Sequence, residues 1–205
     1  MSLRGAGCLG DARSGRQEKG HKGWLSGQAD IGWSNGLGWY EGFRLLVSVN
    51  PAGVITGFGF ACASTKDQPL AETFFALRRE PNPRAPSVGS AAAGPYVADK
   101  GFEGEENHRR GLECYGARVV CPPRRNGRKR RWPKRLRRWA ASIRQIVETV
   151  YEKLHNAFGL RRERAHELSG LRARLAARVA LHNFCIRLNE QLARPRLSFA
   201  DLLQW

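Results

Sequence analysis

The sequence lacks any long apolar run. Its longest apolar stretches, around residues 45–47 and 54–63, are far shorter than the roughly 18 residues that a membrane-spanning helix needs. The opening MSLRGAGC contains no apolar core of the kind that a secretory signal requires. These absences predict a cytoplasmic protein without a membrane span.

Cysteine patterns that signal zinc or redox chemistry are missing too. The chain has 5 cysteines, an odd number, and no Cys-x-x-Cys pair. None of its 5 histidines stands in a metal-ligand spacing with a cysteine. Such scattered residues are typical of reduced thiols. The expected reduced thiols are Cys8, Cys62, Cys114, Cys121 and Cys185.

Acidic residues are scarce. The 205 residues include 18 Asp plus Glu against 35 Lys plus Arg, a formal net charge of +17. Up to Lys100 there are 11 basic and 8 acidic residues (net +3), and after it 24 basic and 10 acidic residues (net +14). The length suits one domain, and the positive charge is concentrated in the second part of the chain.

Much of this charge lies in one block that contains no acid. Between residues 124 and 138, ten of the fifteen residues are basic. Such a block favours a polyanionic partner, which in the cytoplasm is usually nucleic acid. The alternatives are a solvated loop and, less well supported because the block has no apolar face, a membrane surface. The expected phosphate-binding residues are Arg124, Arg125, Arg128, Lys129, Arg130, Arg131, Lys134, Arg135, Arg137 and Arg138.

Residues 1–42 form a glycine-rich segment that we expect to be irregular. Neither helical nor strand periodicity is evident in it. Its aromatic residues either pack against the edge of a core, which we favour, or stack on nucleic-acid bases. They are Trp24, Trp33, Trp39 and Tyr40.

Regular patterns begin at Phe43. Residues 44–49 and 54–61 are typical of two strands joined by a turn at residues 50–53, which predicts an antiparallel hairpin. Capping residues before Pro69 and the run over residues 70–79 predict a helix.

A strand, a helix and a second strand are expected next. Residues 95–99 and 117–121 are apolar and strand-like, and residues 103–115 between them are helical in character and stopped by Gly116. A strand–helix–strand unit of this length places its two strands in parallel, with a right-handed crossover.

Two long helices complete the expected elements. Apolar residues recur every three or four positions over residues 133–157, which predicts one amphipathic helix. The segment 166–192 carries two apolar stripes, so we expect a helix that is buried on both sides. One stripe is Leu171, Leu175, Val179, His182 and Ile186; the other is Ala177, Leu181, Phe184, Leu188 and Leu192.

This order of elements is that of a ribonuclease H-like α/β fold, a mixed sheet flanked by helices. That fold begins with a central strand ahead of the hairpin, and nothing before Phe43 resembles one. We therefore expect a sheet that lacks its first central strand. The expected organisation is an irregular segment over 1–42, a partial domain over 43–194 and a tail over 195–205.

Two acids stand where such a fold places functional groups. Asp99 comes at the end of a parallel strand, the usual place for functional groups in an α/β sheet. Glu148 lies on the long helix with Arg144 one turn before it. The plainer interpretation is a helix cap for Asp99 and a surface ion pair for Glu148.

The residues around both acids resemble bacterial insertion-sequence transposases of the DDE class. The segment Tyr96–Phe102, with Ala-Asp-Lys-Gly-Phe, resembles the stretch that carries the second catalytic aspartate of that family. The segment Arg144–Glu148 matches the Arg-x3-Glu core of the Tyr-x2-Arg-x3-Glu-x6-Lys signature around the catalytic glutamate. The resemblance covers roughly residues 40–192. It also includes 53–55, 64–67, 168–172 and 178–183.

Three departures from the family pattern stand out. Ala141 replaces the signature tyrosine and His155 replaces the lysine. In the family, the first catalytic aspartate follows an apolar run, and no such run precedes an aspartate here. Asp11 and Asp30 are the only candidates upstream of the hairpin, and both lie in loop-like sequence. The simplest account is a truncated or shifted copy.

The resemblance implies a transposase that binds double-stranded transposon ends, works as a homodimer on DNA and is associated with the bacterial nucleoid. It implies Mg²⁺, or Mn²⁺ in its place, held by Asp99 and Glu148 as catalytic ligands, with Arg144 and the basic block on DNA. Without the first aspartate a second ion would be poorly held, so we expect a defective enzyme. The alternatives are a non-catalytic nucleic-acid-binding remnant and a ribosomal-type basic protein.

Overall fold

The computed structural model describes residues 2–11, 24–34, 38–79, 92–123, 132–160, 163 and 165–202. Six strands form one sheet in the order β2-β3-β1-β5-β6, with β4 also paired to β3. The strands are β1 (Ser2–Asp11), β2 (Asp30–Ser34), β3 (Gly38–Val49), β4 (Ile55–Cys62), β5 (Gly94–Ala98) and β6 (Ala117–Val120).

The sheet has antiparallel and parallel halves. The long strand β3 pairs antiparallel with β2 through residues 38–42 and with β4 through residues 43–49. Its other edge pairs antiparallel with β1, which is parallel to β5, and β5 is parallel to β6. The mixed α/β fold, the β3–β4 hairpin and the parallel β5–β6 unit agree with the sequence-based expectations.

A central strand is present, which corrects the expectation that it is missing. The strand β1 lies between β3 and β5 and pairs with both. Its sequence SLRGAGCLGD has no β-branched residue and three glycines, so its pattern does not predict a strand. β3 pairs with it from Ser2 to Asp11 and β5 pairs with Ser2 and Leu3, so the strand depends on backbone pairing with distant segments.

The segment 1–42 is likewise less irregular than expected, because β2 and the start of β3 also lie in it. Tyr40 is fully buried, as a residue at a core edge would be, whereas Trp33 and Trp39 are opposite one another on β2 and β3 and remain exposed. The proposed domain boundaries stay predictions.

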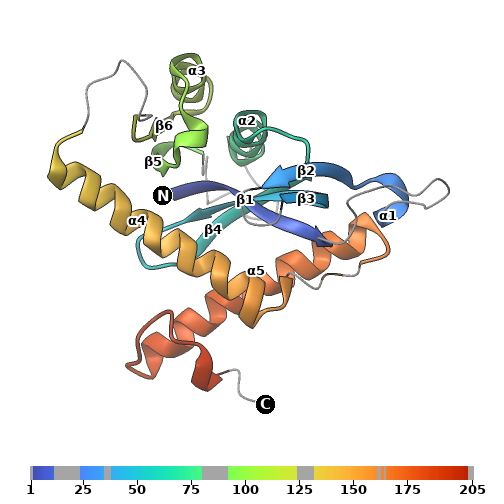
Figure 1. Ribbon diagram of the computed structural model, residues 1–205. Coiled ribbons are helices and arrows are strands. Elements are labelled where there is room, and N and C mark those ends of the chain that lie inside the picture. Colours follow the sequence, from blue (N-terminus) through green and yellow to red (C-terminus); the bar gives the residue numbers. More distant parts are fainter. Residues whose placement is uncertain are drawn as a thin grey trace.

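Helices cover both faces of the sheet. Figure 1 shows α2 (Asp67–Arg79) and α3 (Glu105–Tyr115) on one face, and α4 (Lys134–Glu152) and α5 (Leu168–Gln191) on the other. Two cores result, because successive side chains of a strand point to opposite faces. Leu45 belongs to the core under α4 and α5, and its neighbour Leu46 to the core under α2 and α3.

The helices on the α4 side agree closely with their expected bounds. The α4 helix continues into a π-helical turn, Lys153–Ala157, so the helical segment ends where the periodicity predicts. Within the described ranges, no helix is long and apolar enough to cross a membrane. A short helix, α1 (Trp24–Gly27), precedes β2.

Two segments far apart in sequence meet where α5 crosses the β3–β4 turn. The amide of Asn183 donates to the carbonyl of Ile55 and accepts from its N–H, both at 2.9 Å. His182 Nε2 lies 3.1 Å from the carbonyl oxygen of Gly53. Burial lowers the pKa of His182, so the neutral ring donates this bond from Nε2. These contacts fix α5 on the sheet.

The second apolar stripe of α5 is exposed, which corrects the expectation of burial on both sides. Leu171, Leu175 and Val179 are buried against the sheet. Leu181, Phe184 and Leu192 are 43%, 59% and 50% exposed. Among the described residues no element covers this face, so α5 has one packed and one open side.

Four cysteines have described side chains, and all four are free thiols, as expected. They are Cys62, Cys114, Cys121 and Cys185.

Candidate DNA-processing site

Asp99 lies at the carboxyl end of β5, where the strand gives way to a single 3₁₀ turn. Its Oδ1 accepts from the backbone N–H of Lys100 at 2.8 Å, and Asp99 caps the turn Lys100–Phe102. The buried ring of Phe102 anchors that turn in the core under α2 and α3. The Asp99 side chain is 33% exposed, so the second carboxylate oxygen can reach a ligand.

The first turn of α2 holds the loop that follows Asp99. Gln68 Nε2 donates to the carbonyl of Glu103 at 2.8 Å, and Asp67 pairs with Arg44 of β3 at 2.8 Å. A Cβ at Gly101 would lie 2.8 Å from the Asp67 carboxylate, so only glycine leaves that carboxylate room. Sequence reasoning treated Asp67 only as a capping residue and missed this supporting role.

Glu148 and Asp99 are brought together through Arg144. Arg144 Nε donates to Glu148 Oε1 at 2.9 Å, and Arg144 Nη1 lies 3.8 Å from Asp99 Oδ1. Tyr151 fixes α4 against the sheet, because its hydroxyl donates to the carbonyl of Leu45 on β3 at 2.9 Å. One guanidinium therefore lies against two carboxylates that are separated by 48 intervening residues in sequence.

The central strand supplies no acid at this position. β1 pairs in parallel with β5 so that Leu3 is level with Ala98, which places Arg4 level with Asp99. Asp11 ends β1 seven residues further on, about 23 Å along an extended strand. Asp30 begins β2, and its carboxylate accepts from its neighbour Ile31. Asp30 pairs with Gly42, which is also opposite Gly10, so the backbone positions of Asp11 and Asp30 lie at the same level of the sheet, far along the strands from Asp99.

Comparison with known proteins gives the family. The model of the Transposase DDE domain matches residues 11–184 of the chain. The chain belongs to the DDE transposase domain family. No curated protein and no solved structure matches it. The matched range contains Asp99 and Glu148, the two acids that pair with Arg144, and it ends within α5.

The two carboxylates of this transposase domain are hard oxygen donors, the ligand type that a divalent ion such as Mg²⁺ takes. Mg²⁺ is commonly bound by one or two carboxylates together with substrate phosphate oxygens, and the Asp99–Glu148 pair already holds a cationic group between its oxygens. Among the described residues, no group of three or more acids, histidines and cysteines could hold a metal ion.

Cys121 is the nearest other reactive group. It follows β6, and its Sγ is 3.6 Å from His108 Nε2. Burial, with the negative charges of Glu103 and Asp99, raises the pKa of Cys121 to about 12. The thiol therefore stays protonated near neutral pH and is a poor nucleophile.

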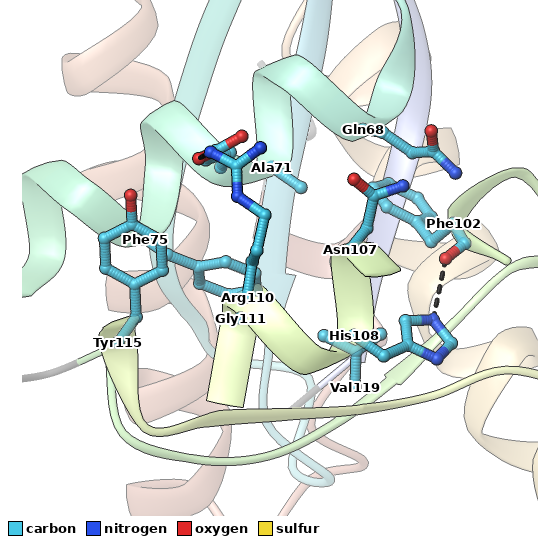
Figure 2. Close-up of a pocket in the computed structure, with 11 residues that line it drawn as sticks. Gln68, Ala71, Phe75, Phe102, Asn107, His108, Arg110, Gly111, Tyr115 and Val119 are labelled. Atoms are coloured by element: carbon cyan, nitrogen blue, oxygen red, sulfur yellow. Dashed lines mark hydrogen bonds and ion pairs between the residues drawn. The ribbon is translucent and has the colours of Figure 1, made fainter. Parts of the chain in front are cut away.

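A small cavity lies between α2 and α3 (Figure 2). Its volume of about 30 Å³ has room for one or two waters rather than a substrate. In Figure 2 the ring of His108 points to the carbonyl of Phe102, at 2.8 Å. Here His108 supports the turn after Asp99.

The described part of the basic block begins α4. Lys134, Arg135, Arg137 and Arg138 are all exposed. Arg137 precedes Arg144 by two helical turns and lies on the same face, about 10 Å along the axis. Arg124, Arg125, Arg128, Lys129, Arg130 and Arg131 lie outside the described residues.

The positions that depart from the family signature are also on this helix. Ala141 is exposed one turn before Arg144. His155 lies in the π-helical turn, with its ring edge-on to Tyr151 at 6.0 Å between centroids. His155 thus packs with the residue that fixes α4 to β3.

Proposed function

We propose that this transposase binds double-stranded DNA and catalyses divalent-metal-dependent DNA cleavage and strand transfer in transposition of the bacterial insertion-sequence type. The observation that carries the proposal is the convergence of Asp99 and Glu148 on one cation-holding position at the carboxyl end of β5. The strand order, with β1 in the centre, supports a ribonuclease H-like arrangement of this site. Work on the chromosome would place the protein at the nucleoid, in the cytoplasm.

The residues have separate tasks in this proposal. Asp99 and Glu148 would hold Mg²⁺, and the ion would supply polarisation of the phosphodiester and a lower pKa for an attacking water or 3′-hydroxyl. Asp99 is kept in place by the Lys100 N–H and by the loop that Gln68 braces. Lys134, Arg137 and Arg138 offer an exposed row of charges for DNA phosphates on the same helix as Glu148.

A second candidate is a non-catalytic nucleic-acid-binding protein. The observation that favours it is the register of β1, which puts Arg4 rather than a carboxylate level with Asp99. A phosphoryl-transfer site with two ions needs more carboxylate ligands than the pair provides. Both proposed functions include nucleic-acid binding through the basic face of α4, and only the first includes DNA cleavage.

The deciding experiment measures binding and nicking on the same DNA. The full chain is titrated onto duplex DNA at several salt concentrations, and the same duplex, supercoiled in a plasmid, is incubated with Mg²⁺, Mn²⁺ or EDTA. Metal-dependent nicking supports the transposase proposal. Salt-dependent binding without nicking in any divalent ion supports the second candidate, and an absence of salt-dependent binding contradicts both.

Charge removal at the start of α4 is expected to weaken DNA binding. The double variant Arg137→Gln/Arg138→Gln should bind duplexes of different sequence more weakly by a similar factor. The slope of log K against log salt should fall by about 0.9 for each lost phosphate contact. Fluorescence anisotropy at 50–200 mM salt, as an order-of-magnitude working range, measures both quantities.

Arg109→Gln is the matched control, because Arg109 is exposed on α3 and paired with Glu106 and Glu113. It should leave the salt slope unchanged. An unchanged slope in the Arg137/Arg138 variant would contradict the role of the α4 face.

We also propose that two copies pair through the open face of α5. The open face begins with small residues, the half-buried Gly170 and the exposed Ala173 and Ala177, and continues with the large exposed residues Leu181 and Phe184. An antiparallel pair sets the small half of each helix against the large half of the other, as a two-fold contact requires. The Cβ position of Gly170 faces open space.

The charge beside this face is partly offset. Arg174 and Arg178 flank the stripe, and both pair with the one buried carboxylate of Glu163. A second copy therefore meets apolar surface with one net positive charge at its edge, rather than two, which favours self-association.

Phe184→Glu is expected to weaken self-association by about tenfold or more, because a charge would replace a large apolar side chain within the contact. Sedimentation equilibrium over a wide protein concentration range measures this. Leu77→Glu, at another exposed leucine on α2, is the control and should dimerise like the wild type. A wild-type chain that stays monomeric throughout, or equal dimerisation of all three, would contradict the proposed face.

A further inference from the structure

Arg144 lies between the two acids that the proposed function assigns to a metal ion. Its Nε and Nη1 face Glu148 and Asp99, at 2.9 and 3.8 Å. The three side chains are 51% (Arg144), 37% (Glu148) and 33% (Asp99) exposed, so solvent and ions reach all of them. The acids thus already have a cationic partner, and that partner sits at the end of a flexible side chain.

We infer that Arg144 acts as a plug of the metal site: without DNA its guanidinium occupies the position between the two carboxylates. DNA removes this plug because a phosphate binds the guanidinium in place of the carboxylates. This inference rests on the proposed function. It adds a rule for the order of events: the chain without DNA binds divalent ions weakly, and DNA and metal strengthen each other's binding.

Charge is the first reason. With Arg144 between them the two carboxylates retain one net negative charge, and with Arg144 withdrawn they retain two. A divalent ion is held better by the doubly negative pair, and a guanidinium left in place would repel it at close range. The plugged and loaded states therefore exclude one another.

Geometry is the second reason. Arg144 shares its face of α4 with the exposed Arg137, two turns nearer the start of the helix. A phosphate backbone that follows Lys134 and Arg137 along this face comes within reach of the Arg144 side chain. A guanidinium binds a phosphate through two parallel N–H···O bonds, so DNA offers Arg144 an alternative to the acids.

The test measures Mn²⁺ binding by the full chain, with free Mn²⁺ followed by electron paramagnetic resonance. Without DNA, Arg144→Gln should bind Mn²⁺ about tenfold more tightly than the wild type. Duplex DNA should raise the affinity of the wild type about tenfold and that of Arg144→Gln by less than about threefold. The Asp99→Asn complex with the same DNA gives the background of ions bound to DNA alone.

Two further variants separate the plug from a general charge effect. Arg144→Lys keeps a cation near the acids, so its Mn²⁺ affinity without DNA should stay within about threefold of the wild type. Arg109→Gln removes one charge from the surface of α3 and should behave like the wild type. A gain in affinity in Arg109→Gln equal to that in Arg144→Gln would overturn the inference.

The outcomes distinguish this inference from the function on which it rests. If Asp99→Asn abolishes Mn²⁺ binding while wild type and Arg144→Gln bind equally with and without DNA, the plug is wrong and the metal site stands. If neither protein binds Mn²⁺ in any condition, the metal site itself is contradicted, and the plug falls with it.

Discussion

Asp99→Asn and Glu148→Gln are each expected to lower metal-dependent nicking of DNA by at least about 10³-fold. Each carboxylate would be half of a one-ion site, because no third ligand lies nearby among the described residues. Losing about 4 kcal/mol of transition-state stabilisation corresponds to this factor. Nicked plasmid formed per hour in Mg²⁺ is the measured quantity.

Both substitutions preserve the local fold, so a loss of nicking can be assigned to the acids. The amide oxygen of an asparagine at position 99 can still accept from the Lys100 N–H, which keeps the cap. A glutamine at position 148 can still accept from Arg144. Thermal unfolding midpoints should therefore stay within a few degrees of the wild type.

Glu152→Gln is the control for charge on the same helix. Glu152 is one turn beyond Glu148 and pairs at the surface with Lys153 and Asn156. Its replacement should change nicking by less than about twofold, since exposed pairs contribute little. Nicking that survives in Asp99→Asn or Glu148→Gln would contradict the assigned roles.

The elements that could be predicted are those with strong local patterns. The strand–helix–strand unit β5–α3–β6 follows from apolar strands around a helix that Gly116 ends in the left-handed region, at φ 68°. The bounds of α4 follow from apolar residues spaced three and four apart, of which Val147, Val150 and Leu154 lie in the core against the sheet. In both cases the local pattern and the tertiary packing agree.

The central strand could not be predicted because its stability comes from neighbours far along the chain. β1 is glycine-rich and contains a register shift between Gly5 and Gly7, which breaks any alternation of side chains. Its partners, β3 and β5, lie about 40 and 90 residues away in sequence. A sequence pattern confined to β1 and its immediate neighbours therefore does not indicate its pairing with β3 and β5.

The residues of the candidate site stay predictions from their motifs, whereas the arrangement of these side chains could not be predicted from the sequence. Asp99 and Glu148 followed from their motifs, and the i, i+4 spacing implied the pairing of Arg144 with Glu148. The approach of Arg144 to Asp99 depends on how α4 docks on the sheet, which Tyr151 and Leu45 determine. The bracing of the Asp99 loop by Asp67 and Gln68 is a long-range contact of the same kind.

Asn183→Ala is expected to lower the free energy of unfolding by about 2–4 kcal/mol, the largest stability effect predicted for a polar residue of this chain. The Asn183 amide makes two hydrogen bonds with the backbone of Ile55, which is itself buried. Alanine removes both and leaves an N–H and a carbonyl without partners at the start of β4. Each such buried group costs about 1–3 kcal/mol.

Urea unfolding followed by circular dichroism measures this effect, and Asn156→Ala is the matched control. Asn156 is exposed and bonds only the Glu152 side chain, at 3.3 Å, so its loss should cost less than about 0.5 kcal/mol. Asn183→Asp keeps the acceptor for the Ile55 N–H and loses the donor, so it should fall between the two. Equal stability of the Asn183→Ala and Asn156→Ala variants would mean that α5 is held on the sheet by its apolar face alone, without the contact to the β3–β4 turn.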